Sequence, residues 1–218
     1  MAHLHSGIMG PVSGKIGNLV YYTYRGKCFV RRAPVKTKKR PTLKQKIQRA
    51  KFALAMNFVS PVAELVNLSY RLVNRKKAGT SILLRNILNE GIVGKYPNLG
   101  IDYSKLKLVR GSLPWSQAIL HQEQGSSRIH ISWEMWAGGT YLEDELIVMM
   151  YCCTTGKWLF SIGDATRLDG ACKLGIDTRI DGETVQIWIA FRSRDHKTFS
   201  DSEFLGEVKI YDTESYEN

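Results

Sequence analysis

The residues of this sequence with the clearest chemical signal are its cations. The first 51 residues contain 13 Lys and Arg side chains and no Asp or Glu. Residues 1–110 carry a net charge of +19, and residues 111–218 carry a net charge of −8. A segment charged with one sign repels itself and is typical of proteins that bind a polyanion. The asymmetry therefore predicts that the N-terminal half binds nucleic acid or another polyanion.

The best candidates for this contact lie in and after a predicted β-hairpin over residues 18–32. Arg25-Gly26 is a two-residue turn signal between runs of β-branched and aromatic residues. That turn pairs Tyr24 with Lys27 and Tyr22 with Phe29, so one face combines rings with cations, as in single-stranded nucleic-acid binders. The alternative is that the rings pack under the helices that follow. The predicted polyanion-binding residues are Arg25, Lys27, Arg31, Arg32, Lys36, Lys38, Lys39, Arg40 and Lys44, and the candidates for base stacking are Tyr22, Tyr24 and Phe29.

Local motifs for phosphate-dependent or hydrolytic chemistry are missing from the sequence. Gly14-Lys15 lies in a glycine-rich stretch, but Ile16 stands where a Walker motif needs Ser or Thr. Residues 14–17 also match the Gly-x-x-Gly loop of KH domains, although their predicted β-structured flanks favour a tight turn. No Gly-x-Ser-x-Gly elbow occurs, and the Asp residues lack calcium-loop spacing. We expect a non-enzymatic protein with no catalytic residues and no cofactor.

The cysteines and the N terminus bear on metal binding and location. Cys28, Cys152, Cys153 and Cys172 form no Cys-x-x-Cys pair, and the adjacent Cys152 and Cys153 should point to opposite faces of a strand. We therefore expect reduced, buried thiols and no metal site. The first residues show no secretory signal, and the apolar stretch 52–68 is interrupted by Asn57, Pro61 and Glu64. We expect a cytoplasmic protein without a membrane span.

A basic linker and a group of helices follow the hairpin. Residues 33–40 are too polar and cationic to pack and are predicted to be extended. Thr42 and Gln45 form a capping-box signal at the start of helical periodicity, and Ser60-Pro61 signals a break. These signals predict helices between about residues 42 and 90.

Beyond residue 105 the pattern changes to alternating strands. We expect strands over 128–136, 145–153, 157–165, 184–193 and 203–211, with weaker ones near Lys107 and Ala171, about seven in all. Trp188 lies out of phase with Ile187 and Ile189, so we predict a protein interface there, unless residues 106–111 or the helices cover it. All five Trp residues fall in this half, which is compatible with a carbohydrate-binding or protein-binding sandwich.

Three segments carry a resemblance to a known group of proteins: GPVSGKIGNLVYYTYRGKCFVRRAP, PTLKQKIQRAKF and SDSEFLG. Over nearly its whole length the chain resembles an uncharacterised bacterial family of unknown function. Its hallmarks are the glycine-rich basic hairpin, the Thr-x-x-Gln helix start, and a C-terminal strand with Ser200, Asp201, Ser202, Leu205 and Gly206. The resemblance implies one recurring architecture and no particular activity.

Together these features predict an α+β protein. Residues 1–104 form the basic hairpin and helical region, and residues 105–218 form an acidic antiparallel β-sandwich of the fibronectin type III or immunoglobulin-like kind. We expect a binding protein whose basic half contacts nucleic acid and whose sandwich contacts proteins. The alternative is a self-assembling structural protein, such as a component of a phage-like or surface particle, joined through its complementary basic and acidic halves.

Overall fold

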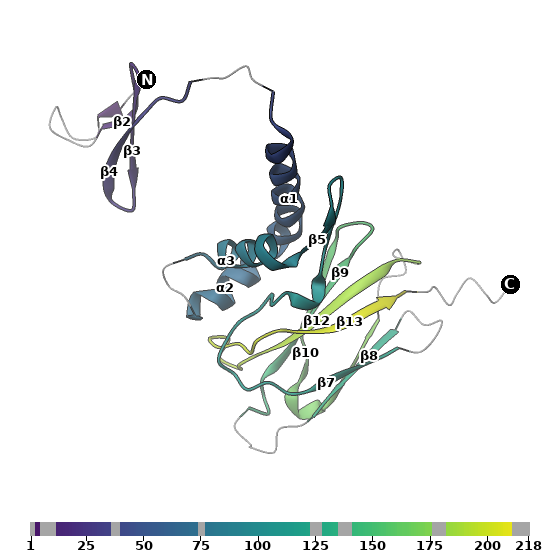
Figure 1. Ribbon diagram of the computed structural model, residues 1–218. Coiled ribbons are helices and arrows are strands. Elements are labelled where there is room, and N and C mark those ends of the chain that lie inside the picture. The colour runs from purple at the N-terminus through teal and green to yellow at the C-terminus, as the bar shows by residue number, and fades with distance from the viewer. Residues whose placement is uncertain are drawn as a thin grey trace. The chain divides into compact units, whose positions relative to one another are not determined.

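The computed structural model describes residues 3–4, 12–35, 40–73, 77–122, 128–134, 141–175 and 182–210. Contacts within the chain divide it into two compact units, residues 1–42 and residues 43–218 (Figure 1). The predicted division between residues 104 and 105 does not separate compact units. The reason is that the helices and the sandwich share a hydrophobic core.

The first unit is an antiparallel sheet with the strand order β1-β2-β3-β4. Its strands are β1 (His3–Leu4), β2 (Val12–Ile16), β3 (Leu19–Tyr24) and β4 (Lys27–Arg32). Strands β3 and β4 form the predicted hairpin, in which Arg25 and Gly26 adopt φ angles of 51° and 75°, as a type I′ turn requires. Gly17, with φ of 55°, turns the chain between β2 and β3. The glycine-rich stretch therefore contributes a tight turn between two antiparallel strands, as its predicted β-structured flanks favoured.

The helices begin close to their sequence signals. Helix α1 (Leu43–Val59) follows Thr42, and the short helix η1 (Ser60–Val62) contains Pro61 and leads into α2 (Ala63–Val73). Helix α3 (Gly79–Asn86) continues into η2 (Ile87–Gly91). A Cβ atom at Gly79 would lie 2.5 Å from the carbonyl oxygen of Val66, so glycine permits the close approach of α3 to α2.

Two short strands after the helices were not predicted. Strands β5 (Ile92–Lys95) and β6 (Asn98–Ile101) pair as an antiparallel hairpin, and the short helix η3 (Tyr103–Lys105) follows. Each strand is only 4 residues long, which is too short for alternation to be recognised in a sequence.

The rest of the chain forms two antiparallel sheets, with strand orders β10-β9-β12-β13 and β11-β8-β7. The strands are β7 (Ala118–Gln122), β8 (Arg128–Trp133), β9 (Glu145–Cys152), β10 (Trp158–Thr166), β11 (Ala171–Gly175), β12 (Thr184–Arg192) and β13 (Glu203–Lys209). The α+β class and the sandwich are confirmed. Counted along the chain, the three-stranded sheet contains the first, second and fifth of these seven strands. The four-stranded sheet contains the third, fourth, sixth and seventh. This is the strand arrangement of a fibronectin type III domain.

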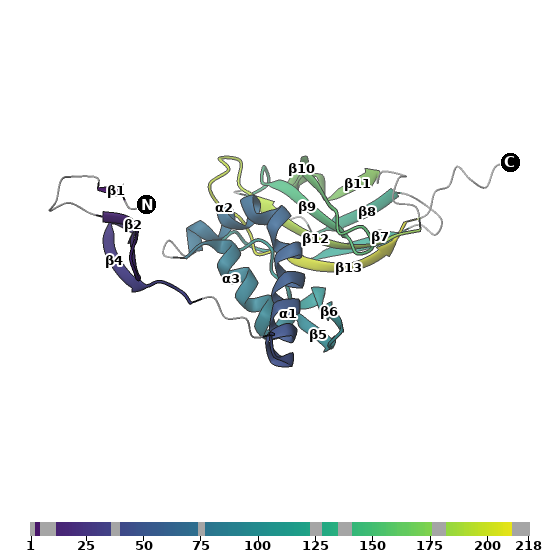
Figure 2. The same ribbon diagram turned by 90° about the horizontal axis from the view of Figure 1, so that it is seen from above.

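Strands β9 and β12 lie in the middle of the four-stranded sheet and bury both faces. One core, between the two sheets, contains Ile131, Leu146, Ile187 and Phe191 among others. A second core lies on the other face of the same sheet, where Ile147, Met149 and Ala190 pack with residues of α1, α2 and α3. Figure 2 shows the three helices grouped on one side of the sandwich. Burial on both faces explains why β9 and β12 read as continuous apolar runs.

Trp188 illustrates the second core and corrects a prediction. Its side chain does lie on the face opposite Ile187 and Ile189, but it is fully buried. Its ring centroid lies 5.7 Å from that of Trp158 and 5.2 Å from that of Phe204. Because the helices cover this face, Trp188 is a core residue and not a surface interface.

The helical run from Leu43 to Arg71 is long and apolar enough to cross a membrane by length and composition alone. Its apolar character has a local explanation in the second core. Ala55, Phe58, Val59, Val62 and Val66 are buried there together with residues of the sheet. This is the packing of a core helix.

A buried ion pair lies inside the sandwich. The guanidinium of Arg167 is fully buried, and its Nε donates to Asp144 Oδ2 at 3.0 Å. Its Nη atoms donate to the hydroxyl of Ser116 and the carbonyl of Pro114, and the Phe191 ring lies 4.0 Å from Arg167 Cζ. Burial raises the pKa of Asp144 against the opposing pull of Arg167, and burial lowers the pKa of Arg167. The geometry satisfies both charges, which a buried pair requires.

The Ser200-Asp201-Ser202 motif holds the segment that precedes β7. Ser202 Oγ accepts hydrogen bonds from the backbone N–H groups of Leu108 and Val109, at 2.8 and 3.2 Å. Asp201 accepts from the Gly111 N–H and from Lys107 Nζ. The predicted strand near Lys107 is therefore wrong, because these donors bond to side chains of the motif and not to a neighbouring strand. The motif is structural.

We expect the Asp201→Asn variant to lose less stability on acidification than the natural protein. Desolvation would raise the Asp201 pKa, but hydrogen bonds from Lys107 and Gly111 outweigh it and leave the pKa below its usual value. Such a group stabilises the fold above its unfolded pKa of about 3.9, and that stability is lost as pH falls through the folded-state pKa. Urea denaturation from about pH 7 to pH 3 measures the difference. Parallel curves for the two proteins would contradict this role.

Candidate nucleic-acid interface

The hairpin has the register that the sequence predicts. Tyr24 pairs with Lys27, Tyr22 with Phe29 and Val20 with Arg31. Strand β2 adds Lys15, which pairs with Val20. Because paired residues in antiparallel strands share a face, one face of the sheet carries the three rings together with Lys15, Lys27 and Arg31.

The rings on this face are arranged with the guanidinium groups. Tyr22 and Phe29 stack with their centroids 5.5 Å apart and an interplanar angle of 22°. Arg31 Cζ lies 5.7 Å from the centroid of Tyr22, and Arg25 Cζ lies 5.4 Å from that of Tyr24. These are cation–π distances. We call this face, defined by Lys15, Tyr22, Tyr24, Lys27, Phe29 and Arg31, the aromatic-basic face.

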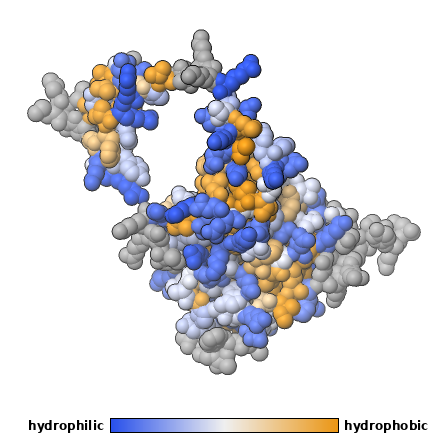
Figure 3. All heavy atoms as spheres, viewed as in Figure 1, coloured by the Kyte–Doolittle hydropathy of each residue, from blue (hydrophilic) through white to orange (hydrophobic). Residues whose placement is uncertain are grey.

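The rings of the aromatic-basic face are at the surface. The exposed fractions are 58% for Tyr24, 41% for Tyr22 and 39% for Phe29. The first unit by itself therefore does not bury these rings in a core of its own. In Figure 3, hydrophobic and hydrophilic residues lie side by side on this unit.

The opposite face of the sheet has a different character. Leu19, Val30 and Ile16 are exposed there, and Tyr21, Thr23 and Cys28 share the face by register. The prediction that all four cysteines are buried is wrong, since Cys28 and Cys153 are exposed. Arg32 pairs with Leu19. The predicted cation Arg32 is therefore on the apolar side, and Arg25 lies in the turn, so the four hairpin cations are not gathered on one face.

The remaining predicted cations fall elsewhere. Lys36, Lys38 and Lys39 lie outside the described residues. Arg40 is exposed in the segment before α1, and Lys44 is exposed in the first turn of α1, within the second unit. Lys15 was not predicted as a contact residue. Its place follows once the turn at Gly17 is recognised, because that turn brings β2 beside β3.

The charge of this unit has no internal counterbalance. Residues 1–51 contain no carboxylate side chain, so any carboxylate or phosphate that neutralises these cations must come from outside that segment. Rings with exposed π-faces next to cations can stack on bases while the cations contact phosphates. Among the described residues, no group of three or more His, Cys, Asp and Glu side chains is placed to hold a metal ion.

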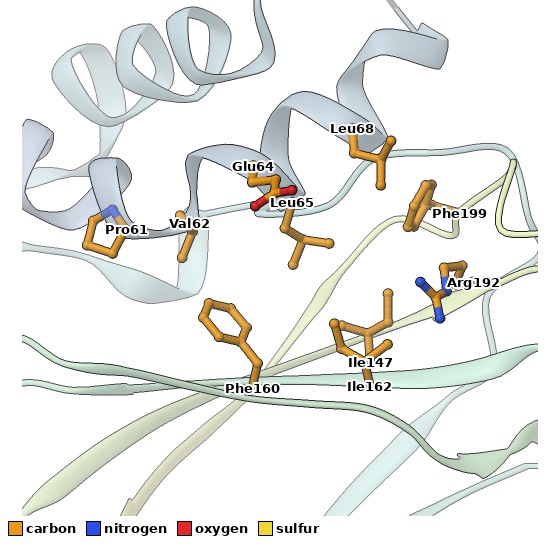
Figure 4. A pocket seen from close by; sticks show the side chains of 10 residues that line it. All are labelled: Pro61, Val62, Glu64, Leu65, Leu68, Ile147, Phe160, Ile162, Arg192 and Phe199. Atoms are coloured by element: carbon orange, nitrogen blue, oxygen red, sulfur yellow. The ribbon is translucent and has the colours of Figure 1, made fainter.

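An apolar pocket of about 310 Å³ lies in the second unit, between α2 and the four-stranded sheet (Figure 4). Leu65, Leu68, Phe160 and Ile162 are among the apolar side chains that line it. The Arg192 guanidinium at one end already forms an ion pair with Glu145. The pocket therefore combines apolar surface with the Glu64 carboxylate and a cation that is already paired.

A protein-family model described as a family of unknown function (DUF6266) matches residues 11–206. The chain belongs to this family. The match runs from the residue before β2 into β13, so the DUF6266 pattern includes both the aromatic-basic face and the Ser200-Asp201-Ser202 motif. The family description names no activity.

Two further comparisons add little to the DUF6266 assignment. A search of curated proteins found no match. Among solved structures, the fn3 domain of the human collagen alpha-1(XX) chain is similar over 46% of this chain and 83% of that chain, with 14% identity and a TM-score of 0.31. A score this low carries no argument, and the sandwich assignment rests on the strand order described above.

Proposed function

We propose that this protein is a non-enzymatic cytoplasmic binding protein whose N-terminal sheet binds single-stranded nucleic acid. The observation that supports the proposal is the aromatic-basic face, where exposed rings alternate with cations in a segment without acidic residues. Under this proposal Lys15, Lys27 and Arg31 contact phosphates while Tyr22, Tyr24 and Phe29 stack on bases. The acidic sandwich is proposed to contact proteins.

Single strands fit this surface better than a duplex does. An unpaired base exposes its π-face, whereas the bases of a duplex are stacked on one another, and each base–aromatic contact contributes about 1–3 kcal/mol. Stacking and phosphate contact do not read base edges, so the proposed binding is tolerant of sequence.

Binding by cations has a measurable salt dependence. Neutralising about five phosphates on a single strand gives a log–log slope of affinity against salt near −3.5. Fluorescence anisotropy of labelled single-stranded and duplex DNA and RNA with the nuclease-treated full chain, between about 50 and 300 mM salt, tests the proposal. Salt-steep binding that favours single strands is expected. Absence of binding at the lowest salt would refute it.

The ring contribution can be separated from charge. The variant with Tyr22→Ala and Phe29→Ala is expected to bind single strands about 30-fold more weakly or worse, because it loses stacking on two rings. Its salt slope should stay unchanged, since no cation is removed. The matched control is Tyr96→Ala in the second unit, another exposed ring. Equal affinities for the two variants would contradict base stacking by the aromatic-basic face.

A second candidate function is self-assembly. The observation that favours it is the opposite face of the N-terminal sheet, where Ile16, Leu19 and Val30 are exposed, together with the net negative charge of residues 111–218. Copies would associate head to tail through complementary charge. Light scattering at low and high salt tests this candidate, and a monomer at every salt and protein concentration would eliminate it.

A further inference from the structure

A polar pocket of about 560 Å³ opens at one edge of the sandwich, where β13 begins. It lies wholly within the second unit and is separate from the aromatic-basic face. Ser104, Lys105 and Lys107 line one side, and Glu203 and Phe204 of β13 line another, with Trp115 beside them. Its volume falls within the range of about 300–1,000 Å³ that is usual for small-molecule sites.

Glu203 has an unmet hydrogen-bonding requirement. Its Oε2 atom is buried and has no hydrogen-bond partner, and among the described residues the only other such side-chain atom is Trp188 Nε1. Burial raises the pKa of Glu203. A buried carboxylate oxygen without a donor is costly, and such atoms in native proteins call for an explanation. Glu203 also lines the pocket, so its carboxylate can serve as an acceptor for a bound ligand.

The other charged side chains of the pocket are already paired. Lys107 Nζ lies 2.7 Å from Asp201 Oδ2, and Lys105 Nζ lies 3.0 Å from Asp102 Oδ2. Each ammonium group still has further N–H bonds to donate. The pocket therefore presents donors from the two lysines and an acceptor from Glu203, without a large excess of either charge.

The pocket also has aromatic walls. Trp115 is half-buried, packs against the core between the sheets and lies 6.3 Å from Phe191 between ring centroids. Phe204 is held against Trp188. These contacts hold the two rings in place, so each presents a fixed apolar surface next to polar groups. This is the usual composition of a specific small-molecule site.

We propose that this pocket binds a neutral carbohydrate. The C–H face of a sugar ring would lie on Trp115, a sugar hydroxyl would donate to Glu203, and the ammonium groups of Lys105 and Lys107 would donate to sugar oxygens. Hydroxyl groups meet all three requirements because each is both a donor and an acceptor. Because Lys105 and Lys107 are already paired with Asp102 and Asp201, the pocket offers an anionic ligand no unpaired ammonium group, and Glu203 would repel such a ligand.

The test follows the backbone amide resonances of the 15N-labelled full chain by NMR. Cellotriose, maltotriose and triacetylchitotriose are each added to about 10 mM, a range that detects millimolar affinity. Binding is expected as saturable shifts of backbone amides at residues 104–107 and 202–204 with at least one of these sugars. Spermidine is titrated in parallel as the cationic probe. If none of the three sugars gives saturable shifts there, or if spermidine binds and the sugars do not, the proposal is overturned.

Variants separate the site from a merely structural role. Glu203→Gln should weaken sugar binding about 10-fold or more, because it replaces a charged acceptor by a neutral one, while raising the melting temperature of the free protein since a buried charge is removed. Trp115→Phe keeps an aromatic side chain in the core and should weaken binding several-fold through loss of ring area. The matched control is Glu134→Gln, an exposed glutamate directly after β8, which should change neither quantity. Equal sugar affinity of Glu203→Gln and the natural protein would refute the assignment.

Discussion

Replacing Asp144 by alanine is expected to lower the free energy of unfolding by about 3–5 kcal/mol. The guanidinium of Arg167 would remain fully buried inside the sandwich without its carboxylate partner. Ser116 and Pro114 can still accept hydrogen bonds from it, but neither carries a compensating charge. Urea denaturation followed by tryptophan fluorescence measures the change, with the midpoint and the slope fitted separately.

Two controls separate a buried charge from a general effect of substitution. Arg194→Ala removes an ion pair with Glu143 in which both side chains are largely exposed, so its effect should be within about 1 kcal/mol. Combining Arg167→Met with Asp144→Leu removes both charges and should restore much of the stability, because hydrophobic replacement of a buried pair is often close to neutral. If Asp144→Ala and Arg194→Ala destabilise the protein equally, the buried pair does not have this role.

Replacing Arg25, Lys27, Arg31 and Arg32 together by alanine is expected to produce the largest loss of nucleic-acid affinity. Each phosphate contact that is lost should reduce the salt slope on a single strand by about 0.7. If all four side chains contact phosphate, the slope falls by nearly 3 and the affinity at low salt falls by orders of magnitude. Arg32 lies on the apolar face of the sheet, so a smaller reduction, near 2, would indicate that this residue does not take part.

The matched control for this variant removes the same charge from the second unit. Arg85, Lys95, Lys157 and Lys173 are exposed there, and their joint replacement by alanine changes the net charge equally. Anisotropy with single-stranded DNA and RNA over the same salt range compares the two variants. Equal losses of affinity would show that net charge alone is responsible, and the aromatic-basic face would then have no special role.

The parts of the fold predicted correctly are those set by local spacing. The turn signal at Arg25-Gly26 fixes the register of β3 and β4, and therefore which rings and cations share a face. The long strands β9, β10, β12 and β13 follow from runs of apolar and β-branched residues. In both cases the determining residues lie within about ten positions of one another.

The parts missed depend on contacts between distant residues. Arg167 and Asp144 are 23 positions apart, and Ser116 is 51 positions from Arg167, so nothing local marks them as one cluster. The residues that line the pocket beside the start of β13 come from three separate segments. Trp188 is a further example. Alternation along the strand predicts that its side chain lies opposite Ile187 and Ile189, but alternation does not show that the helices cover that face of the sheet.

The double burial of β9 and β12 also affects how such a chain can evolve. Sandwich domains are readily exchanged between proteins when the outer surfaces of both sheets tolerate water. In this chain, Ile147, Met149 and Trp188 cover the outer surface of one sheet with apolar side chains. Recombination that separated the sandwich from its helices would expose this apolar surface to water and make the domain prone to aggregation. Selection should therefore keep the helices and the sandwich together in one chain.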